Sequence, residues 1–138
     1  MKTLDPKVAL LRRLPSLAAV RPRDLATVAP LVEDLGVRAG TVLVHEGELC
    51  HEVLLVLEGE AVVSVDARTV GVIGPGDVVG DVAVRDQVAH ATTVIATTDL
   101  HVLVAGPESY RAFVRHPVVV RHVTATLSDR LRRADAGA

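Results

Sequence analysis

Two neighbouring segments decide how this sequence is interpreted: Gly74-Pro75-Gly76-Asp77-Val78-Val79-Gly80-Asp81-Val82-Ala83-Val84 and, after five further residues, His90-Ala91-Thr92-Thr93-Val94-Ile95-Ala96. In the first segment, a Gly/Pro-rich turn leads into a glycine, an acid and a short apolar stretch that can make one helical turn. The backbone N–H groups at the start of such a turn can bind an anion. The pattern therefore indicates an anion site, and a plain turn between two barrel strands is the alternative.

Short apolar runs surround these segments and predict β-strands. They are rich in valine, which favours strands, and turn residues separate them at intervals of about 8–12 residues. Such spacing is typical of an antiparallel sandwich or barrel, here covering about residues 31–105. Glu58-Gly59, between two of the runs, predicts a tight hairpin. The expected strands are Leu31–Val37, Thr41–Val44, Val53–Leu57, Ala61–Val65, Val70–Ile73, Thr92–Ala96 and Leu100–Val104.

Two short helices are expected before the barrel, at about residues 5–30. Asp5-Pro6 begins the first one, because aspartate caps a helix and proline suits its first position. Its apolar stripe extends from Val8 to Leu14, and Pro15 ends it. The second helix is expected over Arg23–Ala29, with Pro30 as its end.

Two further helices are expected after the barrel, at about residues 107–134. Gly106-Pro107-Glu108 begins a short helix that carries Tyr110 and Phe113, the only aromatic residues of the chain. A longer helix begins at Pro117, and its apolar residues recur every three or four positions. This stripe consists of Val120, Val123, Leu127 and Leu131. The predicted fold class is therefore mainly β with flanking helices, in one domain of residues 1–138.

Composition narrows the class of protein. Of the 138 residues, 49% are hydrophobic and 23% charged, which excludes a disordered chain. The single cysteine, Cys50, excludes an internal disulfide and is expected to be a free thiol. No apolar run is long enough to span a membrane, and the first residues are too charged for a signal peptide, so we expect a cytoplasmic protein. The formal net charge of −2 gives no reason to expect nucleic-acid binding.

In the order and spacing of its motifs, the chain resembles the cyclic nucleotide-binding domain family, of the catabolite activator protein and protein kinase A regulatory subunit type. The resemblance extends from about Leu11 to Leu131. It implies a double-stranded β-helix, or jelly-roll barrel, with N-terminal and C-terminal helices. The matching segments are Leu14-Pro15-Ser16-Leu17, Gly40, Glu46-Gly47, Leu55-Val56-Leu57-Glu58-Gly59-Glu60, Gly74-Pro75-Gly76-Asp77, Gly80-Asp81-Val82-Ala83-Val84, Ala91-Thr92-Thr93-Val94-Ile95-Ala96 and Arg130-Leu131.

In that family a phosphate-binding cassette holds the nucleotide, and this chain departs from the cassette at two positions. The resemblance implies that Asp81 stands for the glutamate that binds a ribose hydroxyl, and His90 for the arginine that pairs with the cyclic phosphate. Aspartate is one methylene shorter, and histidine lacks the fixed charge and forked donors of arginine. Arg85 is a candidate for the missing charge, with a solvated loop residue as the alternative. The implied nucleotide site consists of Gly80, Asp81, Val82, Ala83, His90, Ala91 and Thr92.

These departures predict weak cyclic nucleotide binding. A charge-assisted hydrogen bond contributes about 1.5–3 kcal/mol, so its loss weakens binding about ten- to a hundredfold. The last helix also offers no aromatic side chain to stack on a base. We therefore expect a stand-alone regulatory domain that senses cAMP or cGMP weakly or not at all. The alternative is a degenerate domain that acts as a dimerisation or protein-interaction module, with a homodimer formed through the helix Pro117–Leu131.

Other classes of function have less support from the sequence. The candidate metal ligands His45, His51, His90 and His101 lack the His-x-His pair of a cupin-type metal enzyme, and we expect no metal site. The motifs of Ser nucleophiles and phosphate loops are absent too, so no enzymatic activity is expected. Activator-type members of the family continue into a helix-turn-helix, whereas this sequence ends at Ala138, so direct DNA binding is not expected.

Overall fold

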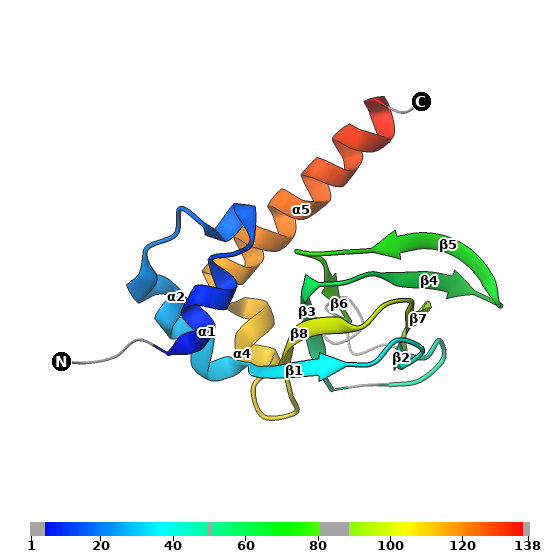
Figure 1. Ribbon diagram of the computed structural model, residues 1–138, viewed down its shortest axis with the longest axis horizontal. Helices are drawn as coiled ribbons and strands as arrows, with labels where there is room; N and C mark the ends of the chain where they lie inside the picture. The colour runs from blue at the N-terminus through cyan, green and yellow to red at the C-terminus, as the bar shows by residue number, and fades with distance from the viewer. Residues whose placement is uncertain (1–4, 50, 81–88, 137–138) are drawn as a thin grey trace.

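The computed structural model describes residues 5–49, 51–80 and 89–136. In Figure 1 the helices α1, α2 and α4 lie together at one end of the β-strands, and the C-terminal part of α5 projects away from both. The helical elements are α1 (Pro6–Leu11), the 3₁₀ turn η1 (Pro15–Leu17), α2 (Pro22–Val28), the 3₁₀ turn η2 (Ala29–Leu31), α4 (Tyr110–Arg115) and α5 (Pro117–Ala136). The strands are β1 (Glu33–Val37), β2 (Val42–Val44), β3 (Val53–Glu58), β4 (Ala61–Val65), β5 (Arg68–Ile73), β6 (Val78–Val79), β7 (Thr93–Ala96) and β8 (Leu100–Ala105).

The strands form two antiparallel sheets, in the orders β1-β8-β3-β6 and β2-β7-β4-β5. This arrangement confirms the predicted jelly-roll barrel with flanking helices. Each of the seven expected apolar runs contains a strand, with bounds that differ by at most a few residues. The short strand β6 was not expected from the sequence, because two residues are too few to show a periodic pattern. It pairs with β3 through Leu54↔Val79 and Leu55↔Val78.

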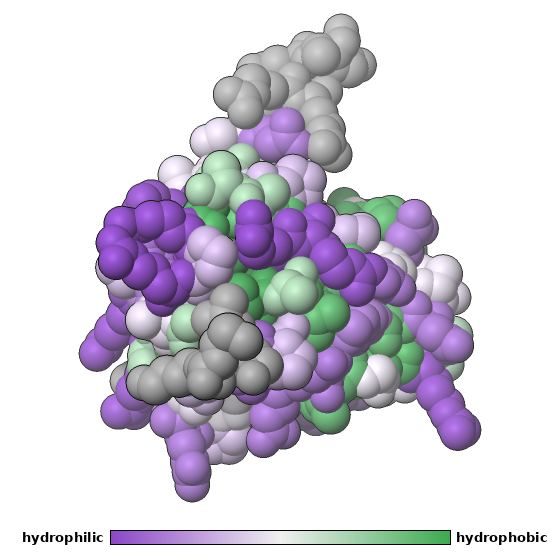
Figure 2. All heavy atoms as spheres, turned by 60° about the vertical axis from the view of Figure 1, so that its left-hand side comes forward, coloured by the Kyte–Doolittle hydropathy of each residue, from purple (hydrophilic) through white to green (hydrophobic). Residues whose placement is uncertain are grey.

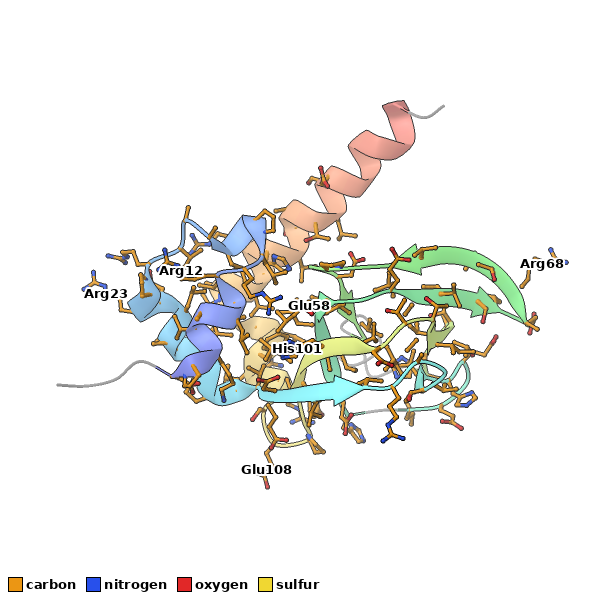
Figure 3. The ribbon with its side chains drawn as sticks, in the orientation of Figure 1. Arg12, Arg23, Glu58, Arg68, His101 and Glu108 are labelled. Carbon is orange, nitrogen blue, oxygen red and sulfur yellow. The ribbon has the colours of Figure 1, made fainter. Side chains whose placement is uncertain are left out.

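The prediction of a hairpin at Glu58-Gly59 was wrong. The strands on either side, β3 and β4, belong to different sheets, so this turn is a corner at which the chain crosses the barrel. Gly59 has a φ of +96°, which favours glycine. The two-residue hairpin lies instead at Asp66-Ala67, between β4 and β5, where both residues have positive φ. In Figure 3, Arg68 marks the tip of this hairpin.

The two N-terminal helices form where they were predicted, but each ends earlier in the sequence than expected. The carboxylate of Asp5 accepts a hydrogen bond from the backbone N–H of Lys7 at 2.9 Å, which confirms the predicted cap. The first helix ends at Leu11 and does not extend to Leu14, which has the extended backbone that a following proline favours. Leu14 is nevertheless buried. Pro30 does not end the second helix directly, since it lies within the 3₁₀ turn that continues from Val28.

The first C-terminal helix begins later than predicted. Gly106-Pro107-Glu108 forms a turn in which the carbonyl of Gly106 accepts hydrogen bonds from the N–H groups of Ser109 and Tyr110. The helix α4 then begins at Tyr110. The longer helix begins at Pro117, as expected. Within the described residues, no helix is both long and apolar enough to cross a membrane.

Two clusters of buried side chains make up the core. One lies between the two sheets and is aliphatic, with Val56, Ala61 and Val102 fully buried. The other joins the helices to the first sheet and contains Phe113, which is 1% exposed. Figure 2 shows the helical end of the molecule, where polar side chains surround smaller hydrophobic areas. The helices are thus attached to the barrel through buried apolar contacts.

Candidate functional site

Gly80 and His90, ten residues apart in the sequence, lie against each other. Gly80 follows β6 directly and has a φ of +91°. A Cβ atom at position 80 would lie 3.0 Å from the carbonyl oxygen of Glu52 and 3.5 Å from Cε1 of His90. Only glycine fits there without strain, because both the backbone conformation and the Glu52 carbonyl exclude a side chain. The structure therefore brings together the two positions that the family resemblance assigned to one site.

The backbone of His90 is held by the loop that precedes β3. Its N–H donates to the carbonyl of Glu48 at 3.0 Å, and its carbonyl accepts from the N–H of Gly47 at 2.8 Å. The side chain is 6% exposed. Its Nε2 atom is buried and has no hydrogen-bond partner among the residues that the structure describes. Buried polar atoms are nearly always paired, so this nitrogen is available to a ligand.

The electrostatic surroundings of His90 favour the neutral imidazole. Burial lowers the pKa of His90 below its ordinary value of 6.5, and the nearby Glu48 carboxylate opposes this with a smaller effect. At neutral pH the ring therefore carries no charge. It offers one hydrogen bond to a ligand and no ion pair, in contrast to an arginine.

The other predicted nucleotide-binding residues are placed only in part. Ala91 is exposed and Thr92 is half-buried, and both follow His90 on the way into β7. Asp81, Val82 and Ala83 lie outside the described residues, and so does Arg85. The residues that precede Asp81 are described as far as Gly80.

A carboxylate that the sequence analysis did not single out organises the loop beside His90. Glu46 accepts a hydrogen bond from the hydroxyl of Thr93 at 3.1 Å and from the backbone N–H of Asp66 at 3.2 Å. Its own N–H donates to the oxygen of the same threonine. These contacts join the loop after β2 to β7 and to the β4–β5 hairpin. Glu46 belongs to a segment that matches the family, but its role has no local signal because its partners are 20 and 47 residues away.

The turn that leads to Gly80 is tied to the last helix. Within the turn, Asp77 accepts a hydrogen bond from the N–H of Gly74 at 2.8 Å. The carbonyl of Gly76 lies 2.6 Å from Nε2 of His122 on α5, a contact that the sequence analysis missed. His122 is 4% exposed and also contacts the hydroxyl of Ser16 in η1. A groove of about 680 Å³ runs past these residues, between α5 and the turn.

The aromatic residues are used in packing. Phe113 belongs to the core, and Tyr110 is 8% exposed and stacks on His51 with the ring centres 5.7 Å apart. Among the described side chains of α5, Val118, Val119 and His122 are buried. Of the predicted stripe, Val123 packs partly buried against the core, Val120 and Leu127 are exposed, and the side chain of Leu131 lies outside the described residues. No aromatic side chain among the described residues of α5 can therefore stack on a base.

The candidate metal ligands are dispersed over the barrel. Among the described residues, no three His, Cys, Asp or Glu side chains lie close enough to hold a metal ion. His101, labelled in Figure 3, lies on β8 and donates a hydrogen bond to Asp34 on the neighbouring strand β1. His51 packs on Tyr110, and His45 is exposed at the end of β2. The described geometry gives the cupin interpretation no support.

The chain is similar to known proteins in both sequence and structure. A family model described as the cyclic nucleotide-binding domain matches residues 35–116. The cyclic AMP receptor protein of Thermus thermophilus is 28% identical over 102 residues, which are 70% of this chain and 47% of the relative. A cAMP-dependent protein kinase regulatory subunit of Eremothecium gossypii is 33% identical over 79% of this chain and 24% of its own length. The chain thus spans less than half of these curated relatives.

Among solved structures, a mutant of a cAMP-binding acyltransferase from Mycobacterium smegmatis superposes with a TM-score of 0.76 and 22% identity. The match covers 92% of this chain and 41% of that one. This likeness concerns the fold: a barrel flanked by helices. The family model covers more than half of the chain, and it includes both Gly80 and His90. The chain belongs to the cyclic nucleotide-binding domain family.

Proposed function

We propose that this chain is a regulatory domain that senses cAMP or cGMP weakly, at a site formed by Gly80, Asp81, Val82, Ala83, His90, Ala91 and Thr92. We take residues 1–138 as one domain that works in the cytoplasm by binding and has no catalytic activity of its own. The observation that carries the proposal is the buried Nε2 of His90, which has no partner among the described residues and lies beside Gly80. A ligand phosphate that meets this nitrogen would complete its hydrogen bonding.

The weakness of the proposed binding follows from the charge of His90. A neutral imidazole gives a phosphate oxygen one hydrogen bond, whereas arginine gives two and an ion pair. Glu48 brings a negative charge near the ring, which further disfavours an anion. Binding then depends mainly on backbone N–H groups, as at other anion sites.

The test is a calorimetric titration of the wild-type protein and of His90→Arg with cAMP and with cGMP. The arginine variant should bind about ten- to a hundredfold more tightly, because it restores a charge-assisted contact of about 1.5–3 kcal/mol. His90→Gln serves as the matched control, since glutamine offers a hydrogen bond without a charge. It should show no such gain, and both variants should retain the circular dichroism spectrum of the wild type.

The pH dependence of binding gives a second criterion. Because burial lowers the pKa of His90, the ring gains its charge only below pH 6.5. Wild-type affinity, relative to that of His90→Arg at the same pH, should rise as the pH falls through that range, because a pH effect that both proteins share does not come from His90. If neither protein binds either nucleotide at any pH, the sensor function is excluded.

A second candidate function is a dimerisation module, and the outer face of α5 favours it. Val120 and Leu127 are 47% and 57% exposed and lie on the same side of the helix. With Val123, and with Val114 of α4, they line a hollow of about 130 Å³. A second copy of α5 would bury this face, and such a homodimer needs no nucleotide.

Sedimentation velocity tests this interface. Leu127→Glu places a charge in the apolar face. It should raise the dissociation constant of the dimer at least about tenfold, which corresponds to about 1.4 kcal/mol. Ser128→Glu places the same charge on the neighbouring exposed position, outside that face, and should leave the dimer intact. A wild-type protein that remains monomeric at high concentration would exclude the module.

A further inference from the structure

His116 lies directly before α5 and binds the start of that helix, and its contacts define where its ring carries a proton. Its Nδ1 accepts a hydrogen bond from the backbone N–H of Val118 at 3.2 Å. Because a backbone N–H can only donate, Nδ1 carries no proton, and in the neutral ring the proton is on Nε2. Nε2 lies 2.8 Å from the hydroxyl oxygen of Thr27, whose own proton goes to the carbonyl of Asp24 at 2.6 Å. A continuous series of hydrogen bonds thus links the start of α5 to α2.

His122, less than two turns further along α5, makes a second bridge. Its Nε2 lies 2.6 Å from the carbonyl of Gly76, which can only accept, so Nε2 carries the proton. In the neutral ring, Nδ1 then accepts from the hydroxyl of Ser16. One side chain therefore joins α5 both to η1 and to the turn before β6. Its exposure is only 4%, so the bridge is largely shielded from solvent.

Protonation acts against both bridges. At His116 it places an N–H on Nδ1, directed at the N–H of Val118, and a positive charge at the N-terminal end of α5, where the helix dipole disfavours cations. At His122 it places a charge in a buried site and forces the Ser16 hydroxyl to reverse its direction. Protonation therefore removes the bond between His116 and Val118, whereas at His122 both partners can still accept and the cost is that of a buried charge.

Charged groups around the two rings oppose this effect only in part. Burial lowers the pKa of His116, and Asp24 on α2 raises it by less. Burial likewise lowers the pKa of His122, with smaller opposing effects from the hydrogen bond to Gly76 and from Asp77. Asp129, also on α5, lines the groove beside His122.

We propose that His116 and His122 form a proton-sensitive clasp, which docks the start of α5 on α2, η1 and the turn at Gly76 while both rings are neutral and releases it in acid. This goes beyond the proposed function, because the clasp needs no nucleotide. The clasp also bears on the proposed nucleotide site, since Gly76 lies four residues before Gly80. Release of α5 would remove the contact of His122 with the turn at Gly76.

The direction of the pH effect follows from the lowered pKa values. The unfolded or undocked chain binds protons at about pH 6.5, before the docked rings do, so docking is fully stable above that pH. It loses stability as the pH falls from 6.5 toward the lowered pKa values. Below them no further loss occurs.

Nuclear magnetic resonance of the whole chain tests the clasp without nucleotide. The ring signals of His116 and His122 should titrate below pH 6.5. Over the same interval, amides in the first two turns of α5 should exchange at least about tenfold faster after correction for intrinsic rates. Amides of β3 and β8 should remain protected, because these strands are central to the first sheet. Unchanged α5 protection at about pH 5 in the wild type would overturn the proposal.

A non-titrating double variant, His116→Asn with His122→Gln, provides the decisive comparison. Asparagine caps a helix, and glutamine can donate to Gly76 while accepting from Ser16, so the helix should stay docked at all pH values tested. His45→Gln is the matched control, since it removes an exposed histidine after β2 and should preserve the wild-type pH dependence. A pH response that persists in the double variant would also contradict the clasp. The wild-type titration decides the question even if the double variant does not fold.

Discussion

Gly59→Ala should destabilise the domain by about 2–6 kcal/mol. Gly59 has a φ of +96°, and a Cβ atom there would overlap the carbonyl oxygen of Asp99 and lie 2.6 Å from Cδ2 of Leu100. The backbone strain costs about 1–3 kcal/mol, and the overlap with a neighbouring loop adds a comparable amount. The sum, about 2–6 kcal/mol, is a large part of the total stability of a typical domain, which is about 5–15 kcal/mol.

The corner position of Gly59 explains why the overlap cannot relax. The chain crosses here from one sheet to the other, and β8 begins at Leu100 on the opposite side of the contact. Urea unfolding monitored by far-ultraviolet circular dichroism measures the effect. Gly36→Ala is the matched control, because a Cβ there meets nothing within 4 Å and the change should stay within about 0.5 kcal/mol. Equal stabilities of the two variants would refute this account of the corner.

Phe113→Ala should cost about 3–5 kcal/mol of the free energy of unfolding. The ring is 1% exposed and belongs to the cluster that joins α1, α2 and α4 to the first sheet. No other phenylalanine exists in the chain to share its role, and the rest of the cluster is mainly aliphatic. Truncation therefore leaves a cavity at the point where the helices meet the barrel.

The comparison with Phe113→Leu separates cavity formation from a general sensitivity of this position. Leucine fills most of the same space, so its cost should remain below about 2 kcal/mol. Thermal and urea unfolding of both variants provide the measurement. If alanine and leucine destabilise the protein equally, the loss does not come from the cavity.

The strands were predictable because their signal is local. Runs such as Ala61–Val65 are apolar and bounded by turn residues, and this run forms a strand with the predicted bounds. Turns at Glu58-Gly59 and Asp66-Ala67 contain similar residue types, yet one is a corner and the other a hairpin. Which strands pair depends on contacts across the barrel, and these have no local signature.

The geometry of the proposed nucleotide site was predictable in part. The order of the family motifs assigned Gly80 and His90 to one site, and they lie against each other. That Nε2 of His90 has no partner among the described residues could not be predicted, because the loop of Gly47 and Glu48 holds the backbone of His90 from a distant part of the chain. Asp81, Val82 and Ala83, outside the described residues, remain predictions.

The helix α5 and one apolar stripe on it could be predicted from local periodicity alone. Which face of the helix is buried depends on the folded chain: Val118, Val119 and His122 face the molecule, while Val120 and Leu127 are exposed. Periodicity shows only that a face is apolar, because it carries no information on what the helix packs against. The partners of His122 are 46 and 106 residues away, so a buried, neutral histidine exists here only because the folded chain brings Gly76 and Ser16 to it.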